Sequence, residues 1–462
     1  MKKMMILFVA LVAAWCVSCS KDDDGGKNPD DPTEDVDKPG EDPDDPDEPG
    51  GEGVIIMTSE GQKIKLRLDF SAISKITIDW GDGTAKEYDN NVDVEYEYSQ
   101  AILHTIKISG CTDLTWFFCS ENQLSSLDVS GCNTLTGLYC SDNQLSSLDV
   151  SGCPDLRELR CSDNQLSSLD VSGCPDLREL WCFSNQLTSL DVIGCPDLIW
   201  LSCSNNQLPS LDVSGCPDLT VLSCSSNQLP SLDVSGCPGL TNLLCSNNQL
   251  PSLNVSGCPD LRELRCSGNQ LPSLDVSGCP VLTFLDCHNN QLSSLDVSGC
   301  PDLRELYCFF NQLTSLNVIG CSGLMMLMCS FNQLPSLDVS GCSDLTLLSC
   351  DNNQLTSLDV NGCLDLMMLE CSFNQLPSLD VSGCSDLTEL YCNINQLSSL
   401  DVSECPALTE LDCSENQFSA SALNQIYTDL PTTDGNITAI SNPGYPESDK
   451  NIATNKGWIF NE

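Results

Sequence analysis

The stretch LRELRCSDNQLSSLDVSGCPD (residues 156–176) decides the fold, because a close copy of it begins again every 21 residues. The asparagine of this unit forms an unbroken column from Asn122 to Asn416, which amounts to about fifteen copies. Self-similarity at a fixed period is the signature of a solenoid, in which each coil packs on its neighbours. The 462 residues therefore extend along one axis instead of surrounding several separate cores.

The unit also repeats itself internally. Residues 156–164 (LRELRCSDN) and 166–174 (LSSLDVSGC) share one pattern of apolar and polar positions. Alternating apolar residues point inward from a strand, so we expect two short strands in each coil and two short parallel sheets. Proline cannot donate to a ladder, so the second strand is expected to start one residue later in six coils: those with Pro209, Pro230, Pro251, Pro272, Pro335 and Pro377.

Turn residues close each coil. We expect the constant asparagine, such as Asn164, to hydrogen-bond backbone groups of its own loop. At the opposite corner, Ser172-Gly173-Cys174-Pro175 predicts a bend in which glycine permits a positive φ and proline ends the pairing.

The unit resembles the leucine-rich repeat, whose signature is LxxLxLxxNxL. Five residues fit the signature in order, with cysteine at the third apolar position: Leu156, Leu159, Cys161, Asn164 and Leu166. The nested halves of 10 and 11 residues are similar to a bacterial subclass. The resemblance implies a mainly β solenoid of about fifteen 21-residue coils over residues 109–418, capped at both ends. Likeness to bacterial surface proteins of this kind implies adhesion or ligand capture.

The first residues read as an export signal. Lys2 and Lys3 precede an apolar stretch, residues 4–17, that is too short to span a membrane. The next residues resemble a bacterial lipoprotein signal, which implies a signal peptide at 1–18 and a lipid on Cys19, with Cys16 in place of the usual leucine. A plain cleaved signal peptide without lipid is the alternative.

Residues 19–53 are rich in Asp, Glu, Pro and Gly, cannot form a core, and are expected to be a disordered acidic linker. Lys21 with the aspartates after it resembles a tag that sends lipoproteins to the outer face of the outer membrane. This resemblance implies a lipid-anchored protein facing the cell exterior, in contact with the membrane through its N-terminal lipid only.

Residues 54–108 alternate apolar and polar residues as strands do. Within them, Asp79-Trp80-Gly81-Asp82-Gly83-Thr84 resembles the WGDG motif of PKD-type β-sandwich modules, which implies a β-rich N-terminal cap. Asp79 and Asp82 leave two alternatives, a calcium site or a tight glycine-containing turn.

Residues 419–462 are expected to cap the far end. Leu423, Ile426 and Tyr427 have helical spacing within residues 421–430, and residues 437–440 read as a strand. The tail, with Lys456-Gly457-Trp458, resembles the C-terminal caps of bacterial repeats.

Cysteine occurs 32 times, twice in the signal region and otherwise in two columns, exemplified by Cys161 and Cys174. Both columns fall at inward positions, where cysteine serves as a small hydrophobe. Column neighbours would have parallel Cβ vectors, which suit a disulfide poorly. We expect reduced, buried thiols; disulfides, which secreted chains favour, and metal binding are the alternatives. The sequence predicts no cofactor and no metal site.

The charge balance, 66 acidic against 19 basic residues and a net charge of −47, repels nucleic acid phosphates. No nucleic-acid partner is expected. His104 and His288 are the only histidines, far apart in sequence and without a nucleophile constellation. The sequence therefore predicts neither catalytic residues nor an enzyme.

The two expected strands differ in how much they vary. The second repeats Ser-Leu-Asp-Val, and its outward aspartate, expected to be a solvating acidic rail, is replaced only at Asn254 and Asn317. The first strand varies, and positions that vary are free to hold function. It is expected to hold every Lys and Arg between Cys111 and Asp449: Arg157, Arg160, Arg178, Arg262, Arg265 and Arg304. A later apolar patch comprises Met325, Met326, Met328, Met367 and Met368.

Aromatic and arginine side chains in a row are what recognition surfaces use. The candidate ligand-binding residues are Trp116, Phe118, Tyr139, Arg157, Arg160, Arg178, Trp181 and Trp200. We expect a cell-surface lipoprotein whose solenoid binds an extracellular protein, peptide or glycan. The alternative is a passive structural spacer or coat protein, in which Arg and Glu merely pair along the sheet.

Overall fold

The computed structural model describes residues 51–72 and 74–461. The expected signal peptide (residues 1–18), Cys19 and residues 20–50 of the expected linker lie outside the described residues. Within the described part of the chain, no helix is long and apolar enough to cross a membrane.

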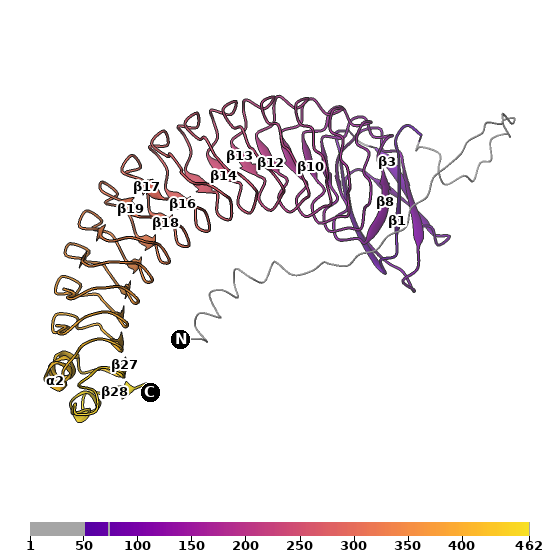
Figure 1. Cartoon of the computed structure of the whole chain (residues 1–462). Coiled ribbons are helices and arrows are strands. Elements are labelled where there is room, and N and C mark those ends of the chain that lie inside the picture. Colours follow the sequence, from indigo (N-terminus) through magenta and orange to yellow (C-terminus); the bar gives the residue numbers. More distant parts are fainter. Residues whose placement is uncertain (1–50, 73, 462) are drawn as a thin grey trace, which may run out of the picture. The chain divides into compact units, whose positions relative to one another are not determined.

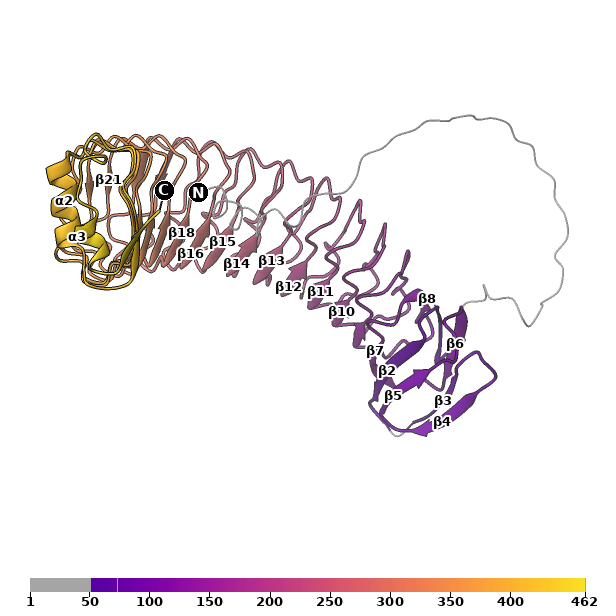
Figure 2. The ribbon, with the colours of Figure 1, turned by 90° about the horizontal axis from the view of Figure 1, so that it is seen from below.

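The first half of each coil forms a short strand, and these strands stack in parallel, 21 residues apart (Figures 1 and 2). Leu159, for example, lies opposite Leu138 and Leu180. Within the repeat region this sheet lies on the inner side of the curve in Figure 1. Its strands are β7 (Leu114–Phe118), β9 (Gly137–Tyr139), β10 (Glu158–Arg160), β11 (Glu179–Trp181), β12 (Trp200–Ser202), β13 (Val221–Ser223), β14 (Asn242–Leu244), β15 (Glu263–Arg265), β16 (Phe284–Asp286), β18 (Glu305–Tyr307), β20 (Met326–Met328), β22 (Leu347–Ser349), β24 (Met368–Glu370), β25 (Glu389–Tyr391) and β26 (Glu410–Asp412).

The second half of the coil forms strands in only some of the described coils. Two pairs occur: β17 (Ser294–Asp296) with β19 (Ser315–Asn317), and β21 (Leu337–Asp338) with β23 (Leu358–Asp359). Single bridges join Asp128, Asp149, Asp170 and Asp191 in turn, and Asp359 with Asp380. The mainly β solenoid with short parallel sheets is confirmed, with the second sheet interrupted.

Proline explains the longest interruption. Beside β19, Thr314 N donates to Ser293 O of the preceding coil at 2.9 Å. Proline at this position has no N–H to give, and four successive coils carry it: those of Pro209, Pro230, Pro251 and Pro272. The expected second strand, starting one residue later, does not form in these four coils.

A left-handed residue precedes each ladder asparagine, as at Asp163 with φ of 52°. The sequence placed the positive φ at the opposite corner, on glycines such as Gly173. That expectation is wrong for most coils, because only Gly110, Gly320 and Gly362 of that column have a positive φ. Close packing favours glycine at position 173 instead, since a Cβ there would lie 3.1 Å from the Cα of Ser151 in the preceding coil.

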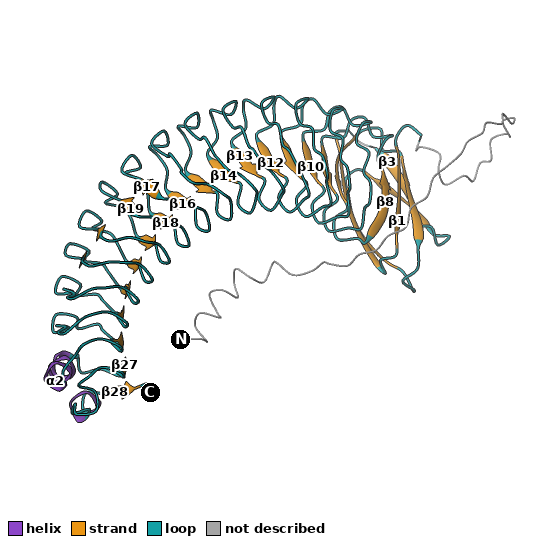
Figure 3. Ribbon diagram, viewed as in Figure 1, coloured by secondary structure: helices purple, strands orange, loops and turns teal. Residues whose placement is uncertain are grey.

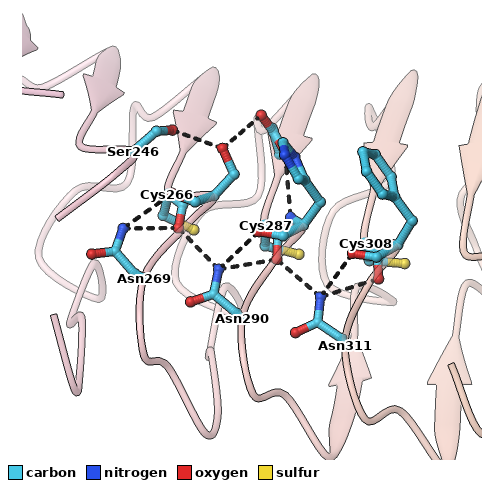
Figure 4. Close-up of polar contacts among 11 residues, drawn as sticks. Ser246, Cys266, Asn269, Cys287, Asn290, Cys308 and Asn311 are labelled. Atoms are coloured by element: carbon cyan, nitrogen blue, oxygen red, sulfur yellow. Dashed lines mark hydrogen bonds and ion pairs between the residues drawn. The ribbon is translucent and has the colours of Figure 1, made fainter. Parts of the chain in front are cut away.

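The constant asparagines form a ladder that joins successive coils (Figure 4). Asn290 Nδ2 donates to Cys287 O of its own coil at 3.1 Å and to Cys266 O of the preceding coil at 3.0 Å. Its Oδ1 accepts from Leu271 N at 3.1 Å. The expected bonds within the loop are present, and bonds between coils accompany them.

The ladder runs past both ends of the repeat. Asn122 bonds the backbone N and O of Lys65, each at 2.7 Å. At the other end, Asn442 lies outside the 21-residue pattern, yet its Nδ2 donates to Cys413 O at 3.0 Å and Ala439 O at 2.9 Å. The solenoid therefore has about sixteen turns.

All thirty cysteines of the described residues are buried, free thiols. Cys174 Sγ, for example, donates to Val150 O of the preceding coil at 3.6 Å. The predicted burial is confirmed, and both columns fill the core as small apolar side chains do.

The N-terminal strands continue into the first coil. They are β1 (Val54–Ser59), β2 (Lys63–Phe70), β3 (Lys75–Asp79), β4 (Ala85–Asp89), β5 (Val92–Glu97), β6 (His104–Ser109) and β8 (Leu124–Asp128). One antiparallel sheet has the order β4-β3-β6-β1-β8. In the other, β2 pairs with β5 on one side and with β7 of the first coil on the other. The open end of the repeat sheet is thus covered by hydrogen-bonded strands.

The Trp80-Gly81-Asp82-Gly83 segment is a tight turn. Asp79 Oδ1 accepts from Gly81 N at 3.0 Å, and Asp82 Oδ1 accepts from Thr84 N at 2.9 Å. Asp82 Oδ2 also accepts from Tyr96 OH at 2.7 Å. Both carboxylates therefore stabilise the turn, in agreement with the turn alternative.

The C-terminal segment contains α2 (Ala420–Asp429), β27 (Gly435–Thr438), α3 (Asn451–Thr454) and β28 (Trp458–Phe460). Figure 3 shows the helices at this end of the coil stack. The predicted helix is confirmed, with Leu423, Ile426 and Tyr427 buried. Lys456 Nζ donates to Leu430 O at 2.5 Å, and Trp458 Nε1 donates to Pro431 O at 2.9 Å. These contacts hold the last strand against the end of the solenoid.

Candidate functional site

The outward aspartate column has a structural role. Asp170 Oδ1 accepts from Ser172 N at 2.9 Å, and the side-chain and backbone hydrogen bonds of Ser172 hold the pKa of Asp170 below its ordinary value. Asn254 and Asn317 keep the same acceptor bond, each at 3.1 Å. The column is therefore constant because its side-chain oxygen forms a turn, which Asp and Asn form more strongly than Ser or Thr.

The varied sheet face carries the candidate residues of the early coils. Trp116, Phe118 and Tyr139 form one aromatic cluster, with centroids of Phe118 and Tyr139 at 4.7 Å and of Trp116 and Tyr139 at 5.9 Å. Gly137 makes room for it, because a Cβ there would lie 2.1 Å from the Trp116 ring. Arg67 from β2 lies 5.0 Å from the Phe118 centroid. The end of the sheet is therefore a packed aromatic surface.

Arg160 lies at the centre of the next cluster. Its guanidinium lies 4.5 Å from the Tyr139 ring and 5.1 Å from the Trp181 ring. It pairs with Glu158 at 2.6 Å and Glu179 at 3.8 Å. Arg160 is thus held by partners within the sheet, as the alternative of cross-strand pairing predicted.

Trp181 and Trp200 stack, with centroids 4.9 Å apart and planes 14° apart. Trp181 Nε1 donates to Glu179 at 3.3 Å. Trp200 Nε1 is buried and has no hydrogen-bond partner among the described residues. Burial and a hydrogen bond to Glu158 raise the pKa of Tyr139, so its hydroxyl stays protonated near neutral pH.

Arg157 and Arg178 differ from Arg160. The sequence placed them on the strand, but each lies one residue before it, exposed at the strand's entrance. Neither guanidinium forms an ion pair or stacks on a ring among the described residues. Arg262 and Arg304 occupy the same position in later coils and are likewise exposed and unpaired there. The prediction that all six arginines lie on the strand is therefore wrong for these four, and they are the ones free to meet a ligand.

A second cluster, not predicted from the sequence, surrounds a hollow of about 550 Å³. It is lined by Asn242, Arg262, Glu263, Arg265, Thr283, Phe284, Glu305 and Tyr307. Arg265 pairs with Glu263 at 2.5 Å and lies 4.4 Å from the Phe284 ring. The signal for it was present, because Glu263-Leu264-Arg265 repeats Glu158-Leu159-Arg160 beside a new set of aromatic residues.

Within the described residues, no three or more His, Cys, Asp or Glu side chains gather as a metal site would require. The arrangement of the candidate residues is that of a surface for contact, with arginines, aromatic rings and carboxylates on parallel strands.

The chain belongs to the leucine-rich-repeat proteins. The family described as leucine-rich repeats (two copies) matches residues 154–195 and 280–320. The functional domain of InlJ from Listeria monocytogenes, described as including a cysteine ladder, is 33% identical with a TM-score of 0.65. The alignment covers 73% of this chain and 77% of that one.

Two further solved structures are similar. YopM from Yersinia enterocolitica is 30% identical over 67% of this chain and 65% of its own, with a TM-score of 0.56. A leucine-rich-repeat protein of Leptospira interrogans, 23% identical over 72% of this chain and 86% of its own, with a TM-score of 0.56, supports the fold alone. A comparison with curated proteins gives no match. The fold is typical of protein-binding domains, and leucine-rich-repeat solenoids are typically non-enzymatic binding scaffolds.

Proposed function

We propose that this chain is a cell-surface lipoprotein whose leucine-rich-repeat sheet binds an extracellular protein, peptide or glycan. The observation that carries the proposal is the pair Arg157 and Arg178, exposed and unpaired on adjacent coils beside the stacked rings of Trp181 and Trp200. An unpaired guanidinium offers five donors to carboxylate, phosphate or carbonyl groups. Flanking rings supply apolar contact with little loss of side-chain freedom.

The two halves of the coil differ in how much their outward residues vary, and this difference supports a binding face on the first strand. The aspartate column is constant because it forms turns, whereas the strand face changes from coil to coil without disturbing the stack. Residues that the fold does not require, placed on a rigid sheet, are the pattern of a binding face. Catalysis forms no part of the proposal.

We place the protein at the outer membrane, anchored by a lipid on Cys19 and facing the cell exterior, with no other membrane contact. The sequence around Cys19 and the acidic residues after it support this location. Metabolic labelling with a radioactive fatty acid tests the anchor. Label should enter the wild-type chain and be lost in Cys19→Ala, and protease added to intact cells should digest the repeat region.

Arg157→Ala/Arg178→Ala, assayed on protein and glycan arrays, tests the binding face. We expect at least a tenfold loss of affinity for any ligand found, because two unpaired cations are removed. Arg262→Ala/Arg304→Ala removes the same charge from later coils, and it should lose less affinity than Arg157→Ala/Arg178→Ala if the ligand lies on the coils of Trp181 and Trp200.

The alternative, a passive spacer or coat component, is favoured by the internal pairing of Arg160 and Arg265 with glutamates of the same sheet. In that case the wild-type chain would bind nothing on the arrays, or would bind with an affinity that Arg157→Ala/Arg178→Ala leaves unchanged.

A further inference from the structure

The left-handed position before each ladder asparagine changes character along the chain. Up to Asn289 it holds Asn, Asp, Ser or Gly, apart from Glu121 in the first coil. In later coils it holds three phenylalanines and an isoleucine at the same backbone angle, φ between 52° and 56°: Phe310, Phe331, Phe373 and Ile394. Asn352 and Glu415 occupy the same position in two of these coils.

Bulky and β-branched residues rarely adopt this conformation, and they cost backbone free energy where they do. Burial does not offset the cost, because the side chains of Phe310, Phe331 and Phe373 are 45%, 38% and 41% exposed. The neighbouring coils show that Asn or Gly satisfies the fold at this position. These three residues, the phenylalanine edge, are therefore retained for something other than stability.

The edge is ordered. The rings of Phe310 and Phe331 stack with centroids 4.4 Å apart, and Phe309 meets Phe310 edge-on at 5.7 Å. Phe309 in turn stacks on His288 at 4.3 Å. The rings of Phe309, Phe310 and Phe331 present an ordered apolar surface along two consecutive coils, and Phe373 lies two coils further on, after the coil of Asn352.

Methionines cover the sheet beside this edge. Met326, Met328 and Met368 lie half-buried on β20 and β24, and Met325 and Met367 at the strand entrances are 40% and 50% exposed. Methionine is flexible and polarisable, and methionine-rich surfaces suit varied apolar side chains. Apolar residues thus span the sheet from one edge to the other.

Carboxylates whose negative charge is not paired with a Lys or Arg of the described residues lie among these apolar residues. Ser349 Oγ donates to Glu370 at 2.6 Å and to Asp351 at 3.1 Å. Asp351 is also bound to the phenylalanine edge, because its carbonyl accepts from Phe331 N at 3.0 Å. Burial, together with the charges of Asp351 and Glu389, raises the pKa of Glu370.

No cation balances them locally. Residues 305–449 contain no Lys, Arg or His, in contrast to the early coils, where Arg160 pairs with Glu158 and Glu179. A ligand with positive charge would therefore supply the counter-charge that the chain itself omits.

The geometry points to a second binding surface on residues 309–394, which takes a polypeptide segment carrying Lys or Arg among apolar side chains. The apolar anchors of the segment contact the phenylalanine edge and the methionines, and its cation meets Glu370 and Asp351. Methionine and isoleucine favour apolar side chains over sugar rings, which bind chiefly on aromatic faces. This surface lies on other coils than Arg157 and Arg178 and does not rest on the function proposed for them.

Synthetic peptides test the proposal by fluorescence anisotropy with the full chain. The first is an amphipathic Leu/Lys helix, the second has every Lys replaced by Glu, and the third has every Leu replaced by Ser. The Leu/Lys peptide should bind most tightly, and the Leu/Glu peptide should not bind. The Lys/Ser peptide measures attraction to the acidic surface at large, and it should bind at least tenfold more weakly.

Phe310→Asn/Phe331→Asn/Phe373→Asn should lower the affinity for the Leu/Lys peptide at least tenfold. The same variant should unfold at an equal or higher temperature, because Asn suits the left-handed conformation. Ser184→Asn/Ser226→Asn, in the same column of early coils, is the matched control and should leave binding unchanged. Glu370→Gln should weaken binding several-fold and reduce its salt dependence.

Three outcomes overturn the proposal: no binding of the Leu/Lys peptide to the wild-type chain, equal binding of the Leu/Glu peptide, or unchanged affinity in the triple phenylalanine variant. A fourth is self-association of the wild-type chain in sedimentation that the triple variant abolishes, because the occupant would then be a second copy. The Arg157→Ala/Arg178→Ala variant should keep full affinity for the peptide, which separates this surface from the first.

Discussion

Asn206 and Gln207 are equally constant columns of the repeat, yet the structure gives them different importance. Asn206 Nδ2 donates to Cys182 O of the preceding coil and Cys203 O of its own coil, both at 3.0 Å. Its Oδ1 accepts from Leu187 N at 2.9 Å. The Gln207 side chain is exposed and forms no hydrogen bond within the described residues.

Asn206→Ala leaves the buried Leu187 N without an acceptor, whereas Cys182 O and Cys203 O each lose one of two hydrogen bonds and keep the one from Asn185 or Asn227. An unsatisfied buried group costs about 1–3 kcal/mol and each of the two other lost hydrogen bonds about 0.5–1.5 kcal/mol, so a loss of about 2–6 kcal/mol is expected. Gln207→Ala removes only an exposed side chain and should change stability by less than about 0.5 kcal/mol. Because coils interact mainly with their nearest neighbours, the damage from Asn206→Ala should centre on the two coils that it joins.

Urea unfolding followed by circular dichroism measures the free energies of the two variants. Hydrogen exchange resolved by peptide should show faster exchange around residues 182–207 in Asn206→Ala alone. The reasoning is refuted if Asn206→Ala costs less than about 1 kcal/mol, or if the two alanine variants are equally destabilised. Either result would mean that the ladder amide is replaced by water at little cost.

Three further predictions concern the core and the sheet. Denatured, unreduced protein should show close to thirty reactive thiols, whereas far fewer would indicate disulfides; the native chain should react slowly with the same reagent. Burial raises the pKa of Cys195 to about 11 and that of Cys161 to about 12, from an ordinary 9.0. The unfolded chain therefore loses these protons first, and each thiol lowers stability by about 1.4 kcal/mol per pH unit between its two pKa values. In reductant, circular dichroism should show stability intact below pH 9 and a steep loss between pH 9 and 11, and a fold that persists at pH 12 would contradict this. Gly137→Ala should cost about 1–3 kcal/mol by displacing the Trp116 ring, while Gly239→Ala, with open space around it, should be neutral in the same melting assay.

Much of the fold follows from the repeat itself. Leu156, Leu159 and Cys161 recur at a fixed spacing, so their inward positions and the parallel register of the coils could be predicted without any tertiary information. The aromatic cluster of Trp116, Phe118 and Tyr139 was predicted for the same reason, because outward positions on stacked strands must be neighbours.

The partners of polar side chains could not be predicted in this way. Arg157 and Arg160 are three residues apart and equally basic in the sequence, but Arg160 lies between Tyr139 and Trp181 and pairs with glutamates, whereas Arg157 is free. The hollow beside Phe284 depends on side chains from four successive coils. Such contacts depend on the direction of each side chain, both within a strand, as for Arg160 with Glu158, and between coils, as for Arg160 with Tyr139 and Trp181.

The sequence by itself determined the solenoid, the length of its coil, the buried leucine and cysteine columns and the acidic character of the chain. Each of these is a property of one unit copied many times, so it is readable from a single copy. The tertiary structure decided which half of the coil forms a continuous sheet, why the aspartate column is constant, and which arginines remain unpaired. It also showed that Phe310, Phe331 and Phe373 adopt a positive φ. The reason is physical. Hydrogen bonds, ion pairs and backbone angles depend on the contacts between one coil and the next, and the repeat pattern in the sequence does not specify those contacts.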